Sequence, residues 1–194
     1  HIMGRLEPLP DDAEKNYEFE SKVVGGRIPT EYIPSVDKGF QSIMVKGPLA
    51  GYEIIGVKMI LDDGTHHAVD SSDMAFQICA RDAMRQVFLQ SKPVLLEPIM
   101  KVQVESPIEF QGTVIGDLAS RRGMIQETET QGPLTTITST VPLAEMFGYA
   151  TTVRSLSQGK ATFTMEFDSY KRVPRAVQEK IIEAAREAKA GKKS

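Results

Sequence analysis

Apolar and polar residues in the first half of the chain follow strand and helix periods in turn. "YEFESKVV" (17–24) alternates apolar with polar positions, as a half-buried strand does, and "GGRIP" interrupts it with two glycines and a proline. Residues 30–46 place their apolar side chains on one helical face. "YEIIGVKMIL" (52–61) predicts a second strand, and residues 74–90 predict a second helix. The first half is therefore expected to read strand, helix, strand, helix.

A segment with two prolines, "SKPVLLEP" (91–98), separates this pattern from a different one. Beyond it, the expected order is β-α-β-β-α-β, the order of the ferredoxin-like fold, and an amphipathic helix follows Pro174. A strand is expected at 99–105 and a helix at 106–123. Two strands around the turn "QGP" follow at 124–142, then a helix at 143–159 and a strand at 160–170. The sequence thus predicts an α+β protein with two small domains, residues 4–92 and 93–194.

Composition and charge narrow the range of functions. The 194 residues are 41% hydrophobic and 25% charged, as in an ordinary globular protein. Lys plus Arg total 23 against 26 for Asp plus Glu, a formal charge of −3, so any contact with RNA has to be local. With no apolar run near the length of a membrane span and no secretory signal, a cytoplasmic protein without membrane contact is expected, and His1–Met3 read as a cloning remnant.

Several catalytic motifs are missing from the sequence. It contains no GxxxxGK[ST] phosphate loop, no GxGxxG between a strand and a helix, and no GxSxG elbow. A nucleotide-hydrolysing centre therefore has no support in this chain, and no catalytic residue, cofactor or metal is assigned to it.

The adjacent histidines His66 and His67 stand in a turn between the second strand and the second helix. A metal site would need further ligands such as Asp70, and side chains of adjacent residues in an extended turn point apart. Acid/base catalysis and an inert solvated turn are two further interpretations. A fourth is recognition, because the following helix N-terminus, which Asp70 or Ser71 can cap, suits a phosphate. If the two strands are parallel, the loop containing Gly25, Gly26 and Arg27 lies beside this turn.

Several blocks of the sequence together resemble the C-terminal third of bacterial-type elongation factor G. They extend in the family's order from about Tyr17 to Pro174, and they are "GGRIPTEYIPSVDKGFQ", "GPLAGYEIIGVKMILDDGTHHAVDSSDMAF", "KPVLLEPIMKVQVESP", "GDLASRRGMI", "VPLAEMFGYATTVRSLSQGKATFTMEF" and "YKRVP". The resemblance implies the fourth and fifth domains of a translational GTPase that drives translocation of transfer RNA and messenger RNA on the ribosome. GTP and magnesium would belong to a GTPase domain outside this chain, which alone would be no enzyme.

The resemblance also implies folds and a site. The first domain would be ribosomal-protein S5-like, without the strand expected ahead of "RLEPLP", and so with an exposed sheet edge; the second would be ferredoxin-like. His67 falls on the family's tip-loop histidine in the "HxVDSS" context, whereas His66 and Ala68 depart from the family's usual residues. The first domain would reach the small-subunit decoding region, and the second the large-subunit GTPase-associated region. The ribosome or RNA contacts would be Gly25, Gly26, Arg27, Gly64, His66, His67, Asp70, Arg121 and Arg122.

Four alternatives stay open beside translocation. The parent could be a paralogue that acts in ribosome recycling, or a ribosome-protection relative, against which the fit of "HxVDSS" argues. The chain could be a small-molecule-binding regulatory module, since ferredoxin-like domains often bind ligands. It could also be a small enzyme that uses His66 and His67 with Asp70.

Overall fold

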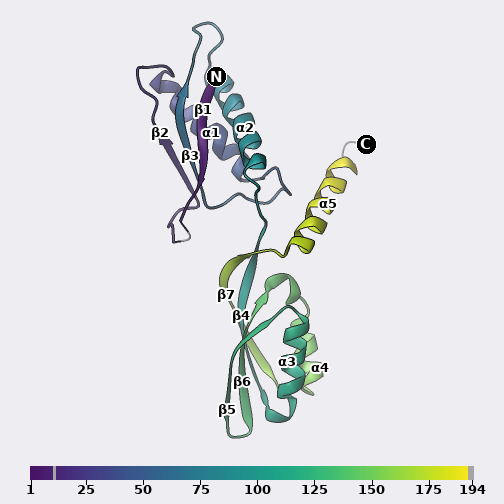
Figure 1. The fold of residues 1–194 in the computed structure, drawn as a ribbon. Helices are drawn as coiled ribbons and strands as arrows, with labels where there is room; N and C mark the ends of the chain where they lie inside the picture. The colour runs from purple at the N-terminus through teal and green to yellow at the C-terminus, as the bar shows by residue number, and fades with distance from the viewer. Residues whose placement is uncertain (11, 192–194) are drawn as a thin grey trace. The chain divides into compact units, whose positions relative to one another are not determined.

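The computed structural model describes residues 1–10 and 12–191, and they form two compact units (Figure 1). One unit comprises His1–Pro93 and the segment that begins at Ala176, and the other comprises Val94–Arg175. The predicted α+β class is confirmed, and the chain divides after Pro93, within "SKPVLLEP". The C-terminal helix α5 (Arg175–Gly191) was expected in the second domain but groups with the first; it buries none of its residues.

The first unit contains a three-stranded sheet with the order β1-β3-β2. Strand β2 (Tyr17–Ser21) runs parallel to β3 (Val57–Gly64), and β1 (Ile2–Pro8) runs antiparallel to it. Helices α1 (Ile33–Met44), which follows a 3-10 turn at Thr30–Tyr32, and α2 (Asp73–Gln90) pack against each other. The predicted strand, helix, strand, helix order is confirmed from β2 to α2.

Strand β1 corrects two expectations: the sequence pattern predicts no strand before Tyr17, and it leaves His1–Met3 outside the fold. Its residues pair with Val57–Gly64, with a bulge between Met3 and Gly4. Gly4 takes the position between the inward-facing Ile2 and Leu6, so the two-residue apolar period is interrupted in the sequence. In this sheet β1 lies at one edge and pairs on one side only.

The first core lies between this sheet and the two helices. Buried side chains from β3, α1 and α2 meet there, among them Leu61, Phe40 and Met84. The helices approach closely at Gly39, because a Cβ there would lie 2.5 Å from the Gln77 carbonyl oxygen. Strand β3 begins at Val57, later than predicted, because Gly56 before it has a φ of +72°.

The second unit contains an antiparallel sheet with the order β5-β6-β4-β7. The strands are β4 (Leu96–Pro107), β5 (Met124–Gln131), β6 (Leu134–Pro142) and β7 (Thr162–Arg172), and the helices are α3 (Gln111–Ser120) and α4 (Tyr149–Leu156). Short 3-10 turns, Ile108–Phe110 and Leu143–Glu145, precede the helices. The ferredoxin-like order is confirmed.

Helices α3 and α4 cover one face of the second sheet. Alternate strand residues, such as Val102 and Val104 in β4, are fully buried under Leu118 and Val153 of the helices. The intervening residues of the strands point to the opposite face. Tyr149, only 1% exposed, lies in this core, and its hydroxyl has no hydrogen-bond partner among the described residues.

Candidate functional site

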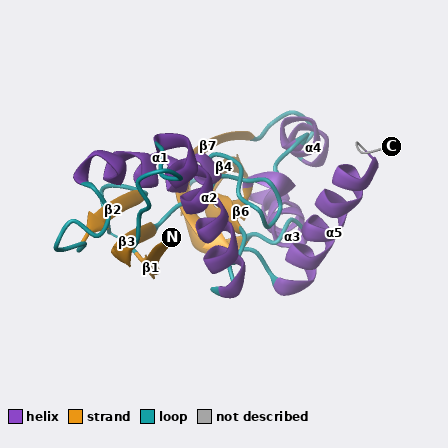
Figure 2. Cartoon of the chain, turned by 90° about the horizontal axis from the view of Figure 1, so that it is seen from above, coloured by secondary structure: helices purple, strands orange, loops and turns teal. Residues whose placement is uncertain are grey.

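Two loops leave the same end of the first sheet, and we call residues 22–29 and 65–72 together the tip. Because β2 and β3 are parallel and pair Ser21 with Leu61, the segments that follow them start at the same edge. The Lys22 amide extends the pairing by donating to the Leu61 carbonyl over 2.8 Å. Figure 1 shows both loops at the top of the first unit, and Figure 2 draws them in teal. The predicted adjacency of the two loops is confirmed.

Direct interactions hold the two loops together. His66 Nδ1 lies 3.1 Å from the Arg27 carbonyl oxygen. Because a carbonyl oxygen only accepts, Nδ1 is the donor, and in a neutral imidazole Nε2 remains an acceptor. Arg27 Nη1 forms an ion pair with Asp63 Oδ2 at 2.7 Å. Both pairs are exposed and contribute little stability, but they fix the spacing of the loops.

His67 lies in a turn that is closed by its own hydrogen bonds. The amides of Asp70 and Ser71 donate to the His67 carbonyl over 3.2 and 3.0 Å, and the His67 amide donates to Ser71 Oγ over 2.9 Å. The imidazole of His67 is exposed and makes no hydrogen bond within residues 1–10 and 12–191. This turn therefore presents a free histidine ring from a fixed backbone.

The cap of α2 differs from the prediction. Ser72, not Asp70 or Ser71, is the N-cap, and its Oγ accepts from the Ala75 amide over 3.1 Å. Asp73 adds a carboxylate to the first turn and accepts a hydrogen bond from Ser35. Ser72 satisfies one free amide and Asp73 places a negative charge at this end of the helix, and both disfavour the phosphate expected there.

The glycines of the tip have two different roles. Gly25 and Gly26 both have φ of +67° with open space around them, so they are required by the backbone conformation. Gly64 is buried beneath the tip, where a Cβ would lie 2.5 Å from both the His1 carbonyl oxygen and the Ile28 Cδ1 atom. The structure gives Gly64 a packing role, and its contact with RNA stays a prediction.

Two exposed valines at the tip are absent from the predicted contact residues. Val24 is 76% exposed and Val69 is 93% exposed. Val24 directly precedes the glycine pair, and Val69 directly precedes Asp70. This position beside predicted contact residues is the sequence feature that could have identified them. With Arg27 paired to Asp63, the tip can offer hydrogen bonds and apolar contact, and it carries little free charge. The part of the chain described here holds no group of three or more His, Cys, Asp or Glu side chains placed for a metal.

The two arginines singled out in the second domain are engaged within the protein. Arg121 donates to Asp117 Oδ2 at 2.8 Å, to the Glu145 carbonyl at 2.6 Å and to Thr152 Oγ1 at 3.1 Å. Its guanidinium carbon lies 5.0 Å from the centre of the Tyr149 ring.

Arg122 donates both terminal nitrogens to the Glu97 carboxylate, at 2.5 and 3.1 Å, and this contact raises the pKa of its guanidinium. The φ of Arg122 is +62°, so the backbone turns sharply after α3. The geometry favours a structural role for both arginines over a contact with RNA.

Taken together, the two sheets and the tip define a two-domain α+β module that presents exposed loops for contact. A family model described as elongation factor G, domain IV, matches residues 1–92, and one described as elongation factor G C-terminus matches residues 94–181. The chain belongs to the elongation factor G family of translation factors, and the two matches meet at the break between its compact units.

Individual relatives agree with this family. Elongation factor G 1 of Syntrophus aciditrophicus is 53% identical over 182 residues, or 94% of this chain, and elongation factor G of Thermotoga maritima is 48% identical over the same length. The chain spans 26% of the length of each of these relatives. A crystal structure of a protein from Thermus thermophilus matches 96% of this chain with a TM-score of 0.83 and 38% identity. The match covers 27% of the chain in that crystal structure. No helix in residues 1–10 and 12–191 has the length and apolar character to cross a bilayer.

Proposed function

We propose that this chain is the ribosome-contacting portion of a GTP-driven translocation factor, and that its tip contacts RNA in the small-subunit decoding region. The observation that carries the proposal is the tip itself, two loops held together at one end of the sheet with the ring of His67 left free. GTP binding and hydrolysis, with magnesium, would belong to the part of the relatives that this chain does not span. In this proposal the chain alone catalyses no reaction.

The tip would act by shape and hydrogen bonding. Its one arginine is paired with Asp63, and the formal charge of the whole chain is −3, so attraction to phosphate is weak. The free imidazole of His67 can donate to or accept from a base or ribose, and the glycine pair lets backbone approach the same surface. After transfer RNA and messenger RNA have moved, such an arm would occupy the vacated space and hinder backward movement.

The second domain would contact the large-subunit GTPase-associated region. Because Arg121 and Arg122 are engaged internally, other groups on the helix side would make this contact. Phe147, which is 78% exposed ahead of α4, and Arg154 in the last turn of α4 are the available side chains.

The test uses a full-length elongation factor G that carries this chain as its C-terminal segment. His67→Ala should slow movement of messenger RNA about 5- to 30-fold, the effect of losing one hydrogen bond worth about 1–2 kcal/mol, and should leave ribosome-stimulated GTP hydrolysis within about twofold. Tyr52→Ala is the matched control, since Tyr52 is 63% exposed and precedes β3 at the other end of the sheet.

Movement and hydrolysis are measured separately in this assay. An equal fall of both would mean that His67 acts on ribosome binding in general, against the proposal. Unimpaired movement would also contradict it, and subunit splitting by the same variant would then test a role in recycling.

A further inference from the structure

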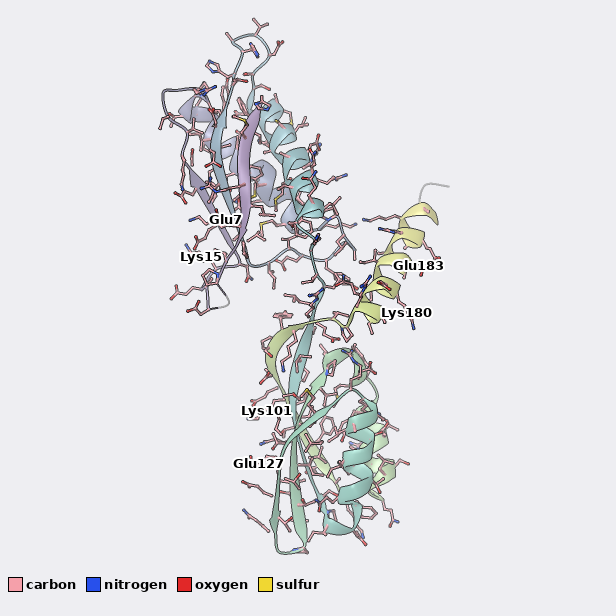
Figure 3. All side chains as sticks on the ribbon, viewed as in Figure 1. Glu7, Lys15, Lys101, Glu127, Lys180 and Glu183 are labelled. Atoms are coloured by element: carbon pink, nitrogen blue, oxygen red, sulfur yellow. The ribbon has the colours of Figure 1, made fainter. Side chains whose placement is uncertain are left out.

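Each loop of the tip is anchored at two points, the end of a strand and the start of a helix. The strand ends are held by the pairing of β2 with β3. Residues 22–29 lead through a 3-10 turn into α1, and residues 65–72 lead directly into α2. Figure 3 draws the side chains of both loops at the top of the first unit. The position of the tip therefore depends on how the first turns of α1 and α2 are joined.

A side-chain hydrogen bond joins these two helix starts. Ser35, in the first turn of α1, donates its hydroxyl to Oδ1 of Asp73, the first residue of α2, over 2.5 Å. Because Ser35 is only 5% exposed, water has little access to replace this partner. A hydrogen bond to a carboxylate is also shorter and stronger than one between neutral groups. We call the hydrogen bond between Ser35 and Asp73 the latch.

Two further contacts continue the join along the helices. The rings of Tyr32 and Phe76 stack with 4.9 Å between their centres and an angle of 24° between their planes. Further along, Gly39 brings the backbone of α1 against α2, since a Cβ there would lie 2.6 Å from the Ala80 Cβ atom. These contacts hold the bodies of the helices together. On α2 the latch lies nearest to the tip, because Asp73 directly follows its second loop.

Hydrogen bonds within the second loop connect Asp73 to His67. Ser72, which precedes Asp73, caps the helix by accepting from the Ala75 amide over 3.1 Å. The Ser71 hydroxyl accepts from the His67 amide, and the Ser71 amide donates to the His67 carbonyl. Since residues 67–72 are held by these bonds, a displacement of Asp73 is transmitted to the closed turn and to the ring that it presents.

We propose that Ser35 and Asp73 are positioning residues for His67, and that the latch sets the place from which the imidazole reaches RNA. This inference rests on the proposed function, because it gives the latch a part in the contact made by His67. Neither residue contacts RNA itself: Ser35 is buried, and the carboxylate of Asp73 repels phosphate. A contact that acts through geometry is sensitive to displacements of about 1 Å, so a lost latch weakens it without removing any contacting group.

The first test uses the whole chain without the ribosome. Ser35→Ala should change the amide chemical shifts of residues 67–71 and the ring signals of His67, although Ser35 stands on the other helix. Asp73→Ala should change the same signals. Asp73→Asn keeps an oxygen that accepts from Ser35, so its signals in the turn should stay close to those of the unsubstituted chain. The matched control is Asp82→Ala, which removes an exposed carboxylate from the middle of α2. Unchanged signals of the turn in Ser35→Ala, or equal changes in Asp82→Ala, would overturn the proposal.

The second test uses the full-length factor and measures movement of messenger RNA and GTP hydrolysis separately. Ser35→Ala should slow movement about threefold to tenfold, with hydrolysis within about twofold, and Asp73→Asn should restore the rate that Asp73→Ala loses. Because the latch acts through His67, adding Ser35→Ala to His67→Ala should slow movement no further. Slowing by the same factor in the double variant would show that Ser35 acts independently of His67 and would contradict the inference.

The outcomes separate this inference from the proposed function. Slow movement in His67→Ala together with normal movement in Ser35→Ala would overturn the role of the latch and leave the proposed function intact. Normal movement in His67→Ala would overturn both, whatever the chemical shifts show.

Discussion

Replacing Arg121 by alanine removes the guanidinium that joins the end of α3 to the start of α4. The side chain is only 17% exposed, and it donates to Asp117, the Glu145 carbonyl and Thr152. Hydrogen bonds to charged groups contribute about 1.5–3 kcal/mol each, but they are not additive when one group makes them all. Breaking one partner of a buried ion pair costs about 3–5 kcal/mol, and because Arg121 is partly exposed we take about 3 kcal/mol.

The assay is urea unfolding followed by the amide signals of the second unit, because the two units need not unfold in one step. With a slope of about 1.5 kcal/mol per molar urea, the midpoint of the second unit should fall by about 2 M. Arg154→Ala is the control, an exposed arginine in the last turn of α4, and should leave the midpoint nearly unchanged. Arg121→Lys keeps the charge but not the forked geometry, so it should lose more than half of the same stability. An unchanged midpoint for Arg121→Ala would refute the structural role and restore Arg121 as a candidate for RNA contact.

Two further changes test packing at named atoms. Gly64→Ala should destabilise the first unit by about 1–3 kcal/mol and lower its melting temperature, because the new Cβ would lie 2.5 Å from His1 and Ile28 atoms. Gly116→Ala, in open space within α3, should stabilise the second unit by about 1 kcal/mol and raise its melting temperature, and the reverse order would contradict both. Tyr149→Phe should leave stability at pH 7 unchanged or slightly higher, because it removes a buried hydroxyl without a partner. Burial raises the pKa of Tyr149 to about 12, above the ordinary 10 of the unfolded chain. The free energy of unfolding is therefore unaffected by this group below pH 10, and it falls as pH rises from 10 through 12, because only the unfolded chain can then lose the phenol proton. Urea midpoints at pH 9 and 11.5 should therefore fall less in Tyr149→Phe, and an equal fall in both proteins would contradict this account.

The strand and helix periods were sufficient to predict most of both domains. Alternation in 17–24 and a helical face in 30–46 placed β2 before α1, and the parallel pairing of β2 with β3 then brought the two loops together. Strand β1 could not be found in the same way, since Gly4 occupies an inward position and carries no side chain to mark the period. Pairing with β3, which is a tertiary contact, makes this segment a strand.

Side-chain partners were the part of the site that sequence could not supply. Ser72, Ser71 and Asp70 are equivalent capping residues by type, and only the backbone of Ser72, with φ of −151°, aims its oxygen at Ala75. Arg121 and Arg122 look alike in sequence as free cations, but acceptors far along the chain, at Glu145 and Glu97, engage them. Local patterns do not encode such distant partners.

The closed turn from His67 to Ser71 has a consequence for the timing of conformational entropy loss. Fixing the backbone of one residue costs about 1–2 kcal/mol, so five residues that became ordered only on contact would cost on the order of 5–10 kcal/mol at that moment. Because the turn holds its own hydrogen bonds, this loss is incurred when the chain folds. A weak contact at His67 can then be made and released quickly, as the proposed function would require.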